Sequence, residues 1–321
     1  MLGGNGVAVL KRRYGAHLSD AARKTLDSRR PYPPLATFRN PLTRQLVRRL
    51  ADSDWEATRE QLDFDYSLTD ESIAGVPCVR MQASTVREGA PLVLFIHGGA
   101  FCAGGARANA AAVLPTLNMT GSIAIGIDYA KAPERVFPAA LEEIESVYRA
   151  LLSQGANPSR MIVCGESAGG NLAVASMMAW REKRLPSPKA CILYSPTLDA
   201  RFAFDTAHTQ HRFDPFVKHF AQREFSDMYE LYAPGMDKSD PRISPAMGNP
   251  AGLPPLLIQV GTREVLLGDS ARFAGAAADA GVDATLRVFD GMFHLFHMHW
   301  RLPEAKKAQA NAAAFIRRHA G

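Results

Sequence analysis

The sequence feature that most constrains the fold is the hexapeptide Gly165–Gly170, which reads Gly-Glu-Ser-Ala-Gly-Gly. The apolar run Met161–Cys164 precedes it, and the segment Asn171–Val174 continues it. These flanks indicate a sharp turn from a strand into a helix, which lifts the hydroxyl of Ser167 clear of the sheet. Small residues beside the serine suit so crowded a turn. The pattern Gly-x-Ser-x-Gly also occurs in ordinary Gly-rich loops, but here the flanks favour a nucleophile elbow.

A second motif, His97–Phe101, follows the apolar run Leu92–Ile96. Its small residues leave backbone N–H groups free to point at a developing oxyanion, where each donor typically contributes about 3 kcal/mol. We expect His97 to brace this loop rather than act as a base, because it precedes the serine and lies on the amide-donating loop. The predicted oxyanion donors are the amides of Gly99, Ala100 and Ala168, with Gly98 as a further candidate.

If Ser167 is the nucleophile of a serine hydrolase, the acid and then the histidine base should follow it in the chain, each on a loop at the end of a later strand. The strand-like run Leu256–Val260 precedes Glu264, and the run Ala284–Phe289 precedes His294. We predict that His294 is the general base for Ser167 and that Glu264 orients its imidazole ring.

Other residues compete for these roles. Asp269 is an alternative triad acid, although its place near the start of a predicted helix suits a cap or first-turn acid. Asp290 lies too close to His294 in sequence to be the first choice. His297 and His299 are candidates for a metal cluster with His294, but no carboxylate or cysteine completes a familiar ligand spacing. We therefore predict neither a metal ion nor an organic cofactor.

Two acids beside these motifs are interpreted as structural. Asp128 ends the strand-like run Ile123–Ile127, where its carboxylate is placed to support the oxyanion loop. Glu166 flanks Ser167, but adjacent side chains in a turn point apart. We expect Glu166 to make a buried hydrogen bond behind the elbow.

Together these motifs resemble the hormone-sensitive lipase family of α/β-hydrolases, from about residue 75 to the C-terminus. The segments that carry the resemblance are His97–Ala100, Asp128–Glu134, Phe137–Ala140, Gly165–Gly170 and Gly291–His294. The resemblance implies hydrolysis of carboxylic esters with short to medium acyl chains through an acyl-serine. Ala100 replaces the commonest third glycine of the family; it keeps the N–H donor unless the backbone requires a positive φ. Glu264 replaces the commoner aspartate.

Two alternatives remain open. The segment Phe293–Glu304, ending in Leu-Pro-Glu, is similar to family members that open cyclic esters such as monoterpene lactones. The competing class is a small-molecule receptor, because some family members keep the fold and lose the catalytic histidine. The presence of His294 favours an enzyme.

Strand-like and helix-like runs alternate from about 75 to 320 without a linker, which predicts one α/β domain with a mostly parallel central sheet flanked by helices. We expect an N-terminal helical cap segment at 1–70 and a catalytic domain at 71–321, with a cap insertion at about 201–247 that is rich in aromatic residues. In the resembling family such segments cover the active site. Predicted helices begin near Ser19 and Asn40 and otherwise span Ala108–Asn118, Ala139–Ser153, Ala168–Arg184, Asp269–Ala280 and Pro303–Arg318.

Charge and cysteine content add weaker constraints. The net charge of +5 comes from scattered basic residues with no nucleic-acid motif, so we expect no nucleic-acid partner. The resemblance implies a small-molecule ester or lactone as the partner. The four cysteines of the chain lack paired spacing and are expected to be free thiols. The first apolar stretch precedes its positive charges, unlike a secretory signal, and no run has membrane-spanning length, so we expect a cytoplasmic protein that does not enter membranes. The oligomeric state is open, with a homodimer as one arrangement.

Overall fold

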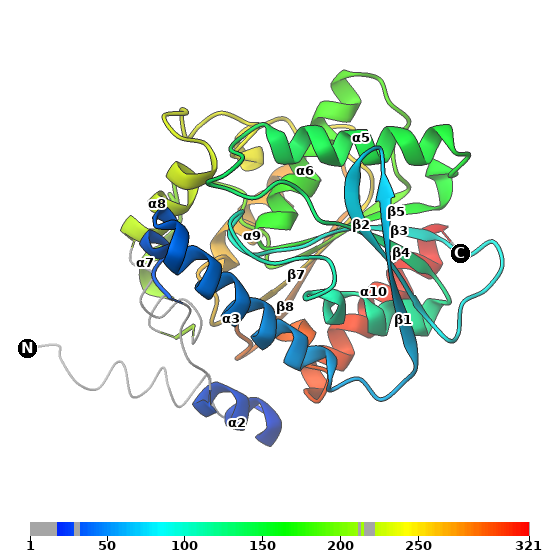
Figure 1. The fold of residues 1–321 in the computed structure, drawn as a ribbon, viewed down its shortest axis with the longest axis horizontal. Helices are drawn as coiled ribbons and strands as arrows, with labels where there is room; N and C mark the ends of the chain where they lie inside the picture. Colours follow the sequence, from blue (N-terminus) through cyan, green and yellow to red (C-terminus); the bar gives the residue numbers. More distant parts are fainter. Residues whose placement is uncertain (1–17, 29–32, 211–212, 215–221, 321) are drawn as a thin grey trace, which may run out of the picture.

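The structure is a computed structural model that describes residues 18–28, 33–210, 213–214 and 222–320. Within these residues, eight strands form one sheet in the order β1-β2-β4-β3-β5-β6-β7-β8 (Figure 1). The pairs from β4 to β8 are parallel, and β2 runs antiparallel to both β1 and β4. The predicted mostly parallel sheet is thus confirmed. The strands are Tyr66–Ile73 (β1), Val76–Ala83 (β2), Leu92–Ile96 (β3), Ile123–Ile127 (β4), Met161–Glu166 (β5), Ala190–Tyr194 (β6), Leu256–Gly261 (β7) and Ala284–Phe289 (β8).

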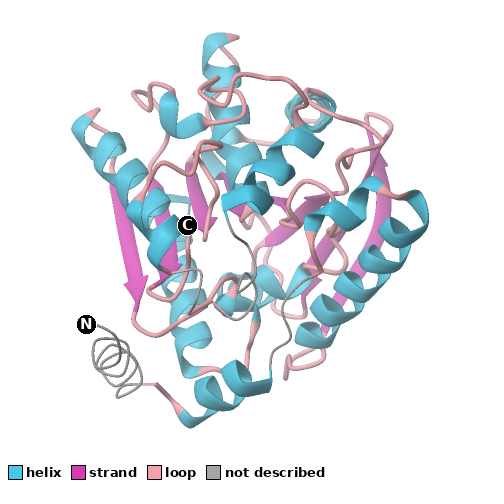
Figure 2. Ribbon diagram, turned by 90° about the vertical axis from the view of Figure 1, so that its left-hand side faces the viewer, coloured by secondary structure: helices cyan, strands magenta, loops and turns pink. Residues whose placement is uncertain are grey.

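Helices cover both faces of the sheet (Figure 2). On one face α4 and α10 pack together against the strands, and on the other α5 lies beside α6, which packs against β5. The central strands β5, β6 and β7 are buried along their whole length, as expected for strands covered on both faces. The described α-helices are Asp20–Ser28 (α2), Pro41–Arg59 (α3), Leu114–Thr120 (α4), Ala139–Ser153 (α5), Ala168–Glu182 (α6), Asp205–Thr209 (α7), Gln222–Tyr232 (α8), Leu267–Asp279 (α9) and Pro303–Ala320 (α10). Short 3₁₀ turns are Leu35–Arg39 (η1), Ala110–Ala112 (η2), Pro158–Arg160 (η3), Pro245–Met247 (η4) and Phe296–Met298 (η5).

The helix predictions are confirmed except for one. Ser19 and Asn40 cap α2 and α3, since their side chains accept from the amides of Ala22 and Leu42. Helices α5, α6, α9 and α10 begin and end within two residues of expectation. The helix expected over 108–118 is instead η2 followed by α4. Pro115 explains this break, because a proline that lacks an N–H fits the first turn of a helix and disrupts an interior.

Strand β1 begins within the segment 1–70, where only cap helices were expected, and ends inside the expected catalytic domain. It is an edge strand whose side chains are mostly polar and partly exposed, so it carries no alternating apolar signal. The sheet consequently begins at Tyr66, a few residues before the expected domain boundary at 70.

The N-terminal segment and the insertion meet over one end of the sheet. Helix α8 packs against η1, and Arg39 forms an ion pair with Asp227 at 3.1 Å. The aromatic side chains of the insertion serve in packing, since those of Phe202, Phe204, Tyr229 and Tyr232 are buried. Phe216 and Phe220 of the same insertion lie outside the described residues, as does the apolar stretch at the N-terminus.

All four cysteines are buried and unpaired. Among the described helices, none is both long enough and apolar enough to cross a bilayer.

Candidate active site

Ser167 occupies the tight turn between β5 and α6 with φ 50° and ψ −120°, a conformation that non-glycine residues rarely adopt. A Cβ on Gly169 would lie 2.1 Å from the carbonyl oxygen of Ile96, and one on Gly165 would lie 2.5 Å from that of Gly169. The predicted crowding is therefore confirmed. The turn requires small neighbours, and in return it exposes the serine hydroxyl to the pocket.

The three predicted catalytic side chains form one hydrogen-bonded row. His294 Nε2 lies 3.0 Å from Ser167 Oγ, and His294 Nδ1 lies 3.0 Å from Glu264 Oε2. Glu264 is fully buried, and its other oxygen accepts from the amide of Gly261 at 2.6 Å and from the hydroxyl of Ser195 at 2.8 Å. The carboxylate is thus held on one side by fixed donors and turned on the other toward the imidazole.

The environment of His294 favours its protonated form. Burial lowers the pKa of this histidine, but the hydrogen bond and the negative charge of Glu264 outweigh burial, so that the pKa is raised above 6.5. His294 becomes positively charged when it takes the proton of Ser167, and the carboxylate of Glu264 stabilises that charge.

The activity of the protein is expected to increase with pH, because only neutral His294 accepts a proton. The acidic limb of kcat/KM should report a pKa above 6.5, the ordinary value for histidine. In Glu264→Gln the largest interactions that raise the pKa of His294 are lost while burial still lowers it, so the limb should move to lower pH. The measurement is kcat/KM as a function of pH for the wild type and for the residual activity of Glu264→Gln. An unchanged limb in the variant would contradict it.

The competing acids have other partners. Asp269 Oδ2 accepts from the backbone amides of Leu198 at 2.5 Å and Asp199 at 3.1 Å, and burial raises its pKa to about 7. Asp290 accepts from the hydroxyl of Thr262 at 3.1 Å. The geometry therefore favours Glu264 as the partner of His294.

The oxyanion loop corrects one prediction. The amide of Gly98 donates a hydrogen bond to Glu166 Oε1 at 3.1 Å, behind the elbow. This N–H group is therefore not free to stabilise an oxyanion. Among the described residues, no acceptor takes a hydrogen bond from the amides of Gly99, Ala100 or Ala168. Gly98 therefore supports the loop, and the other three amides remain candidate donors.

The substitution of alanine for glycine in this loop has a conformational consequence. Ala100 adopts φ 54° and Gly99 adopts φ 118°. Alanine thus takes the left-handed conformation that glycine adopts more readily, and it keeps its N–H group.

The buried residues Glu166 and His97 brace the loop as predicted, whereas Asp128 is half-buried and contacts the chain just beyond the loop. Glu166 Oε1 also accepts from Asn109 Nδ2 at 2.6 Å, and its carboxylate is fully buried. The ring of His97 stacks on Tyr129, and its Nδ1 lies 2.6 Å from the carbonyl of Gly98. Burial lowers the pKa of His97 to about 3, so the ring is neutral and carries its proton on Nδ1, since a carbonyl only accepts. Asp128 accepts from the amide of Ala106 at 2.7 Å.

Sequence reasoning missed three supporting residues. Ser195 follows β6 and holds Glu264, and Asn109 holds Glu166. His297 stacks on Tyr194, and its Nε2 lies 3.4 Å from Glu166 Oε2. Ser195 could have been predicted from the sequence, because polar residues at the carboxyl ends of parallel strands gather at one edge of the sheet. Within the part of the chain that the structure describes, no cluster of histidine, cysteine or acidic residues is arranged to hold a metal ion.

An apolar pocket opens above Ser167 and His294. Its few polar side chains include Ser167, His294 and Thr197, and the remaining lining is aliphatic or aromatic. The N-terminal segment contributes much of the wall, and the insertion contributes Met228. The N-terminal lining residues are Pro33, Leu35, Phe38, Val47, Ala51 and Trp55.

Comparisons with known proteins agree with this geometry. Residues 93–298 match the family model described as alpha/beta hydrolase fold. An acetyl-hydrolase from Streptomyces hygroscopicus is 33% identical over 86% of this chain and 97% of its own length, and an esterase from Acinetobacter venetianus is 35% identical over 74% and 77%. A crystal structure of an esterase from the bacterial hormone-sensitive lipase family superposes with a TM-score of 0.83 at 30% identity, over 94% of this chain and 99% of that one. The chain therefore belongs to the hormone-sensitive lipase family of α/β-hydrolases and is a carboxylic ester hydrolase.

Proposed function

We propose that the protein cleaves carboxylic esters with short to medium acyl chains through an acyl-serine intermediate on Ser167. The observation that carries the proposal is the hydrogen-bonded row from Ser167 through His294 to the buried Glu264, at the base of an apolar pocket. A nucleophile, a base and an orienting acid at 3.0 Å spacing are the parts that acyl transfer needs.

In the first half of the proposed reaction, His294 Nε2 takes the proton of Ser167 as Oγ attacks the ester carbonyl carbon. The carbonyl π electrons move to oxygen, and the amides of Gly99, Ala100 and Ala168 stabilise the resulting charge. When the tetrahedral intermediate collapses, the C–O bond to the alcohol breaks and His294 returns its proton to the leaving alkoxide.

In the second half, a water molecule replaces the alcohol. His294 removes a proton from this water as its oxygen attacks the acyl carbon, and the same three amides stabilise the second oxyanion. Collapse of that intermediate breaks the bond to Ser167 Oγ, which regains its proton from His294. The products are a carboxylic acid and the free enzyme.

The pocket supports a preference for apolar esters and a covering role for the two helical segments. Six of its described lining residues belong to the segment 1–70, and Met228 belongs to the insertion 201–247. We assign both segments to a cap over Ser167. The name of the acetyl-hydrolase relative is consistent with a short acyl group.

The described pocket residues do not favour the lactonase alternative over linear esters. Its signal was the segment Phe293–Glu304 with its Leu-Pro-Glu tail. His294 and Leu295 of this segment line the pocket, but none of the three tail residues is among the described lining residues. Glu304 instead accepts from the amide and hydroxyl of Ser19, which ties α10 to α2. Lactone opening is therefore an outcome of the test below.

Purified protein should hydrolyse p-nitrophenyl esters from acetate to octanoate fastest, and palmitate at least about tenfold more slowly, because the pocket is enclosed by cap residues. Initial rates across acyl lengths test this, with γ- and ε-lactones followed by pH-stat and Ser167→Ala as the blank. Faster opening of lactones than of any linear ester would replace the proposal with the lactonase. Ligand-induced thermal stabilisation without turnover would favour the receptor.

The cytoplasmic location remains a prediction, and the oligomeric state remains open, with a homodimer as one arrangement. Analytical ultracentrifugation of the purified chain addresses the second of them.

A further inference from the structure

Arg48 on α3 joins the N-terminal segment to two loops of the catalytic domain. Its Nε donates to the carbonyl of Cys102 at 2.7 Å, and its Nη2 donates to the carbonyl of Ala132 at 3.0 Å. The guanidinium also forms two hydrogen bonds with Glu134, at 2.7 and 2.8 Å. The side chain of Arg48 is 14% exposed and that of Glu134 is 39% exposed, so the two contacts with backbone carbonyls are more shielded from water than the contacts with Glu134. A planar fork of donors suits such a three-way junction.

The carbonyl of Cys102 belongs to the loop that carries two candidate oxyanion donors. Ala100 and the next residue, Phe101, both have left-handed backbone, with φ 54° and 60°. Non-glycine residues persist in this conformation only where surrounding contacts hold them. The amides of Cys102 and Ala103 donate back to the carbonyl of Gly99, so this loop is one tight turn.

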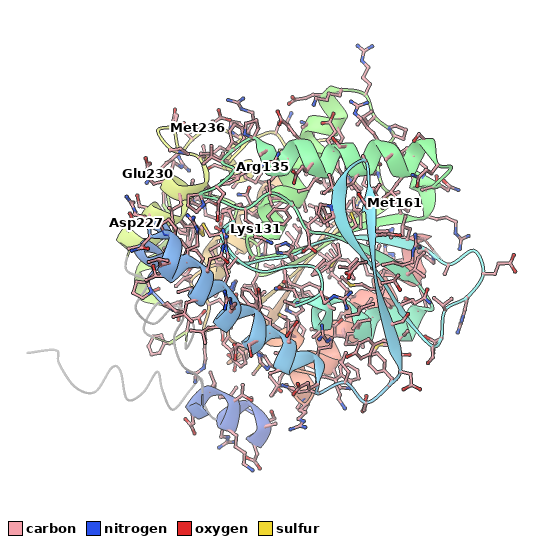
Figure 3. All side chains as sticks on the ribbon, in the orientation of Figure 1. Lys131, Arg135, Met161, Asp227, Glu230 and Met236 are labelled. Carbon is pink, nitrogen blue, oxygen red and sulfur yellow. The ribbon has the colours of Figure 1, made fainter. Side chains whose placement is uncertain are left out.

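Contacts from outside the turn hold it in place. The amide of Ala132 donates to the carbonyl of Phe101 at 2.9 Å. The ring of Phe101 stacks on that of Tyr232 in α8, with centroids 4.0 Å apart. Lys131, which Figure 3 labels, donates from Nζ to the carbonyl of Gly104 at 2.8 Å. Arg48 supplies the corresponding contact from α3.

Helix α3 also forms a wall of the pocket. Val47, Ala51 and Trp55 line the pocket, whereas Arg48 is not among the described lining residues. The same helix therefore lines the pocket with one face and contacts the oxyanion loop with another.

We propose that Arg48 is a positioning residue for the oxyanion donors. By holding the carbonyl of Cys102, Arg48 keeps the amides of Gly99 and Ala100 directed at the oxyanion and couples the rate of the chemical step to the docking of α3. This inference rests on the proposed function, because it assigns a support to the same site.

Arg44 offers a matched control one helical turn away. Its Nε lies 3.0 Å from the same carboxylate of Glu134, and its side chain is 12% exposed. Its Nη1 donates to the carbonyl of Phe38 at 3.2 Å. Arg44→Met thus removes an ion pair of α3 while leaving the contact with Cys102 in place.

The test compares Arg48→Met, Arg48→Lys, Arg44→Met and Glu134→Gln with p-nitrophenyl acetate. In Arg48→Met we expect kcat to fall by about tenfold with KM changed by less than about threefold, because misaligned amides weaken only transition-state binding. Arg48→Lys should fall between wild type and Arg48→Met. Arg44→Met and Glu134→Gln should keep kcat within about twofold, since both retain the contact with Cys102.

Two inhibitors separate positioning from simple loss of structure. A trifluoromethyl ketone adds to Ser167 Oγ and places its oxyanion on the amides, whereas an apolar alcohol only fills the pocket. In Arg48→Met the ketone should bind about tenfold more weakly and the alcohol within about twofold.

An unchanged kcat and ketone affinity in both Arg48 variants, or equal losses for the ketone and the alcohol, would overturn the inference and leave the proposed function intact. If Arg48→Met does not fold, the comparison uses Arg48→Lys instead. A kcat of Arg48→Lys equal to that of Glu134→Gln would then overturn the inference. Wild-type turnover that does not need Ser167 would overturn both.

Discussion

Ser167→Ala is expected to lower kcat/KM for p-nitrophenyl butyrate by on the order of 10⁵-fold. Without the hydroxyl no acyl-enzyme forms, and only the pocket and the oxyanion amides remain to accelerate direct attack by water. The variant should fold normally, because alanine accepts the conformation of the turn no worse than serine and the site is open to the pocket. Initial rates and mass spectra after treatment with a fluorophosphonate measure the effect, and only the wild type should gain the adduct.

Ser176→Ala is the control for the loss of a serine hydroxyl near Ser167, in the helix that follows it. Ser176 lies on α6 and is 2% exposed, and it does not line the pocket above Ser167. Its rates should stay within about twofold of wild type. More than about 1% residual activity in Ser167→Ala, with phosphonate labelling at another residue, would contradict the assignment of the nucleophile.

Glu264→Gln is expected to lower kcat by on the order of 10³-fold. The amide of Gly261 only donates, so the glutamine must keep its oxygen at the Oε1 position. Its NH₂ group then faces His294 Nδ1, which forces the ring into the tautomer that carries hydrogen on Nε2. That ring cannot accept the proton of Ser167, and the stabilising charge on the imidazolium is also lost.

Asp269→Asn is the matched control, since it also neutralises a fully buried carboxylate. Asparagine retains an oxygen for the amides of Leu198 and Asp199, so kcat should remain within about threefold of wild type while the melting temperature falls. Single-turnover measurements on both variants would separate acylation from release. Normal rates in Glu264→Gln together with a large loss in Asp269→Asn would exchange the two roles.

Local sequence signals predicted most of the scaffold because each depends on a physical requirement of a few neighbouring residues. Small residues around Ser167 are required by the turn, and capping residues begin α2 and α3. Strand β1 lacked such a signal, since an edge strand needs no continuous apolar face. Pro115 is the local signal for a break between η2 and α4, but the apolar residues around it favoured the prediction of one continuous helix.

The sequence by itself determined the candidate nucleophile, the order of acid and histidine, and the chemistry that each side chain offers. Only the tertiary structure decided which of these groups meet. In the structure Glu264, and not Asp269, lies within hydrogen-bond distance of His294, and the amide of Gly98 donates to Glu166. The physical reason is that a hydrogen bond is selected by position within a few tenths of an ångström, and those positions depend on how distant strands and loops pack.

The same reason applies to the role of the N-terminal segment. Its composition predicted helices, but the contact of Arg48 with Cys102, 54 positions away, arises from the docking of α3 on the catalytic domain. Residue identity sets what a side chain can donate or accept, and the packed fold selects its partner.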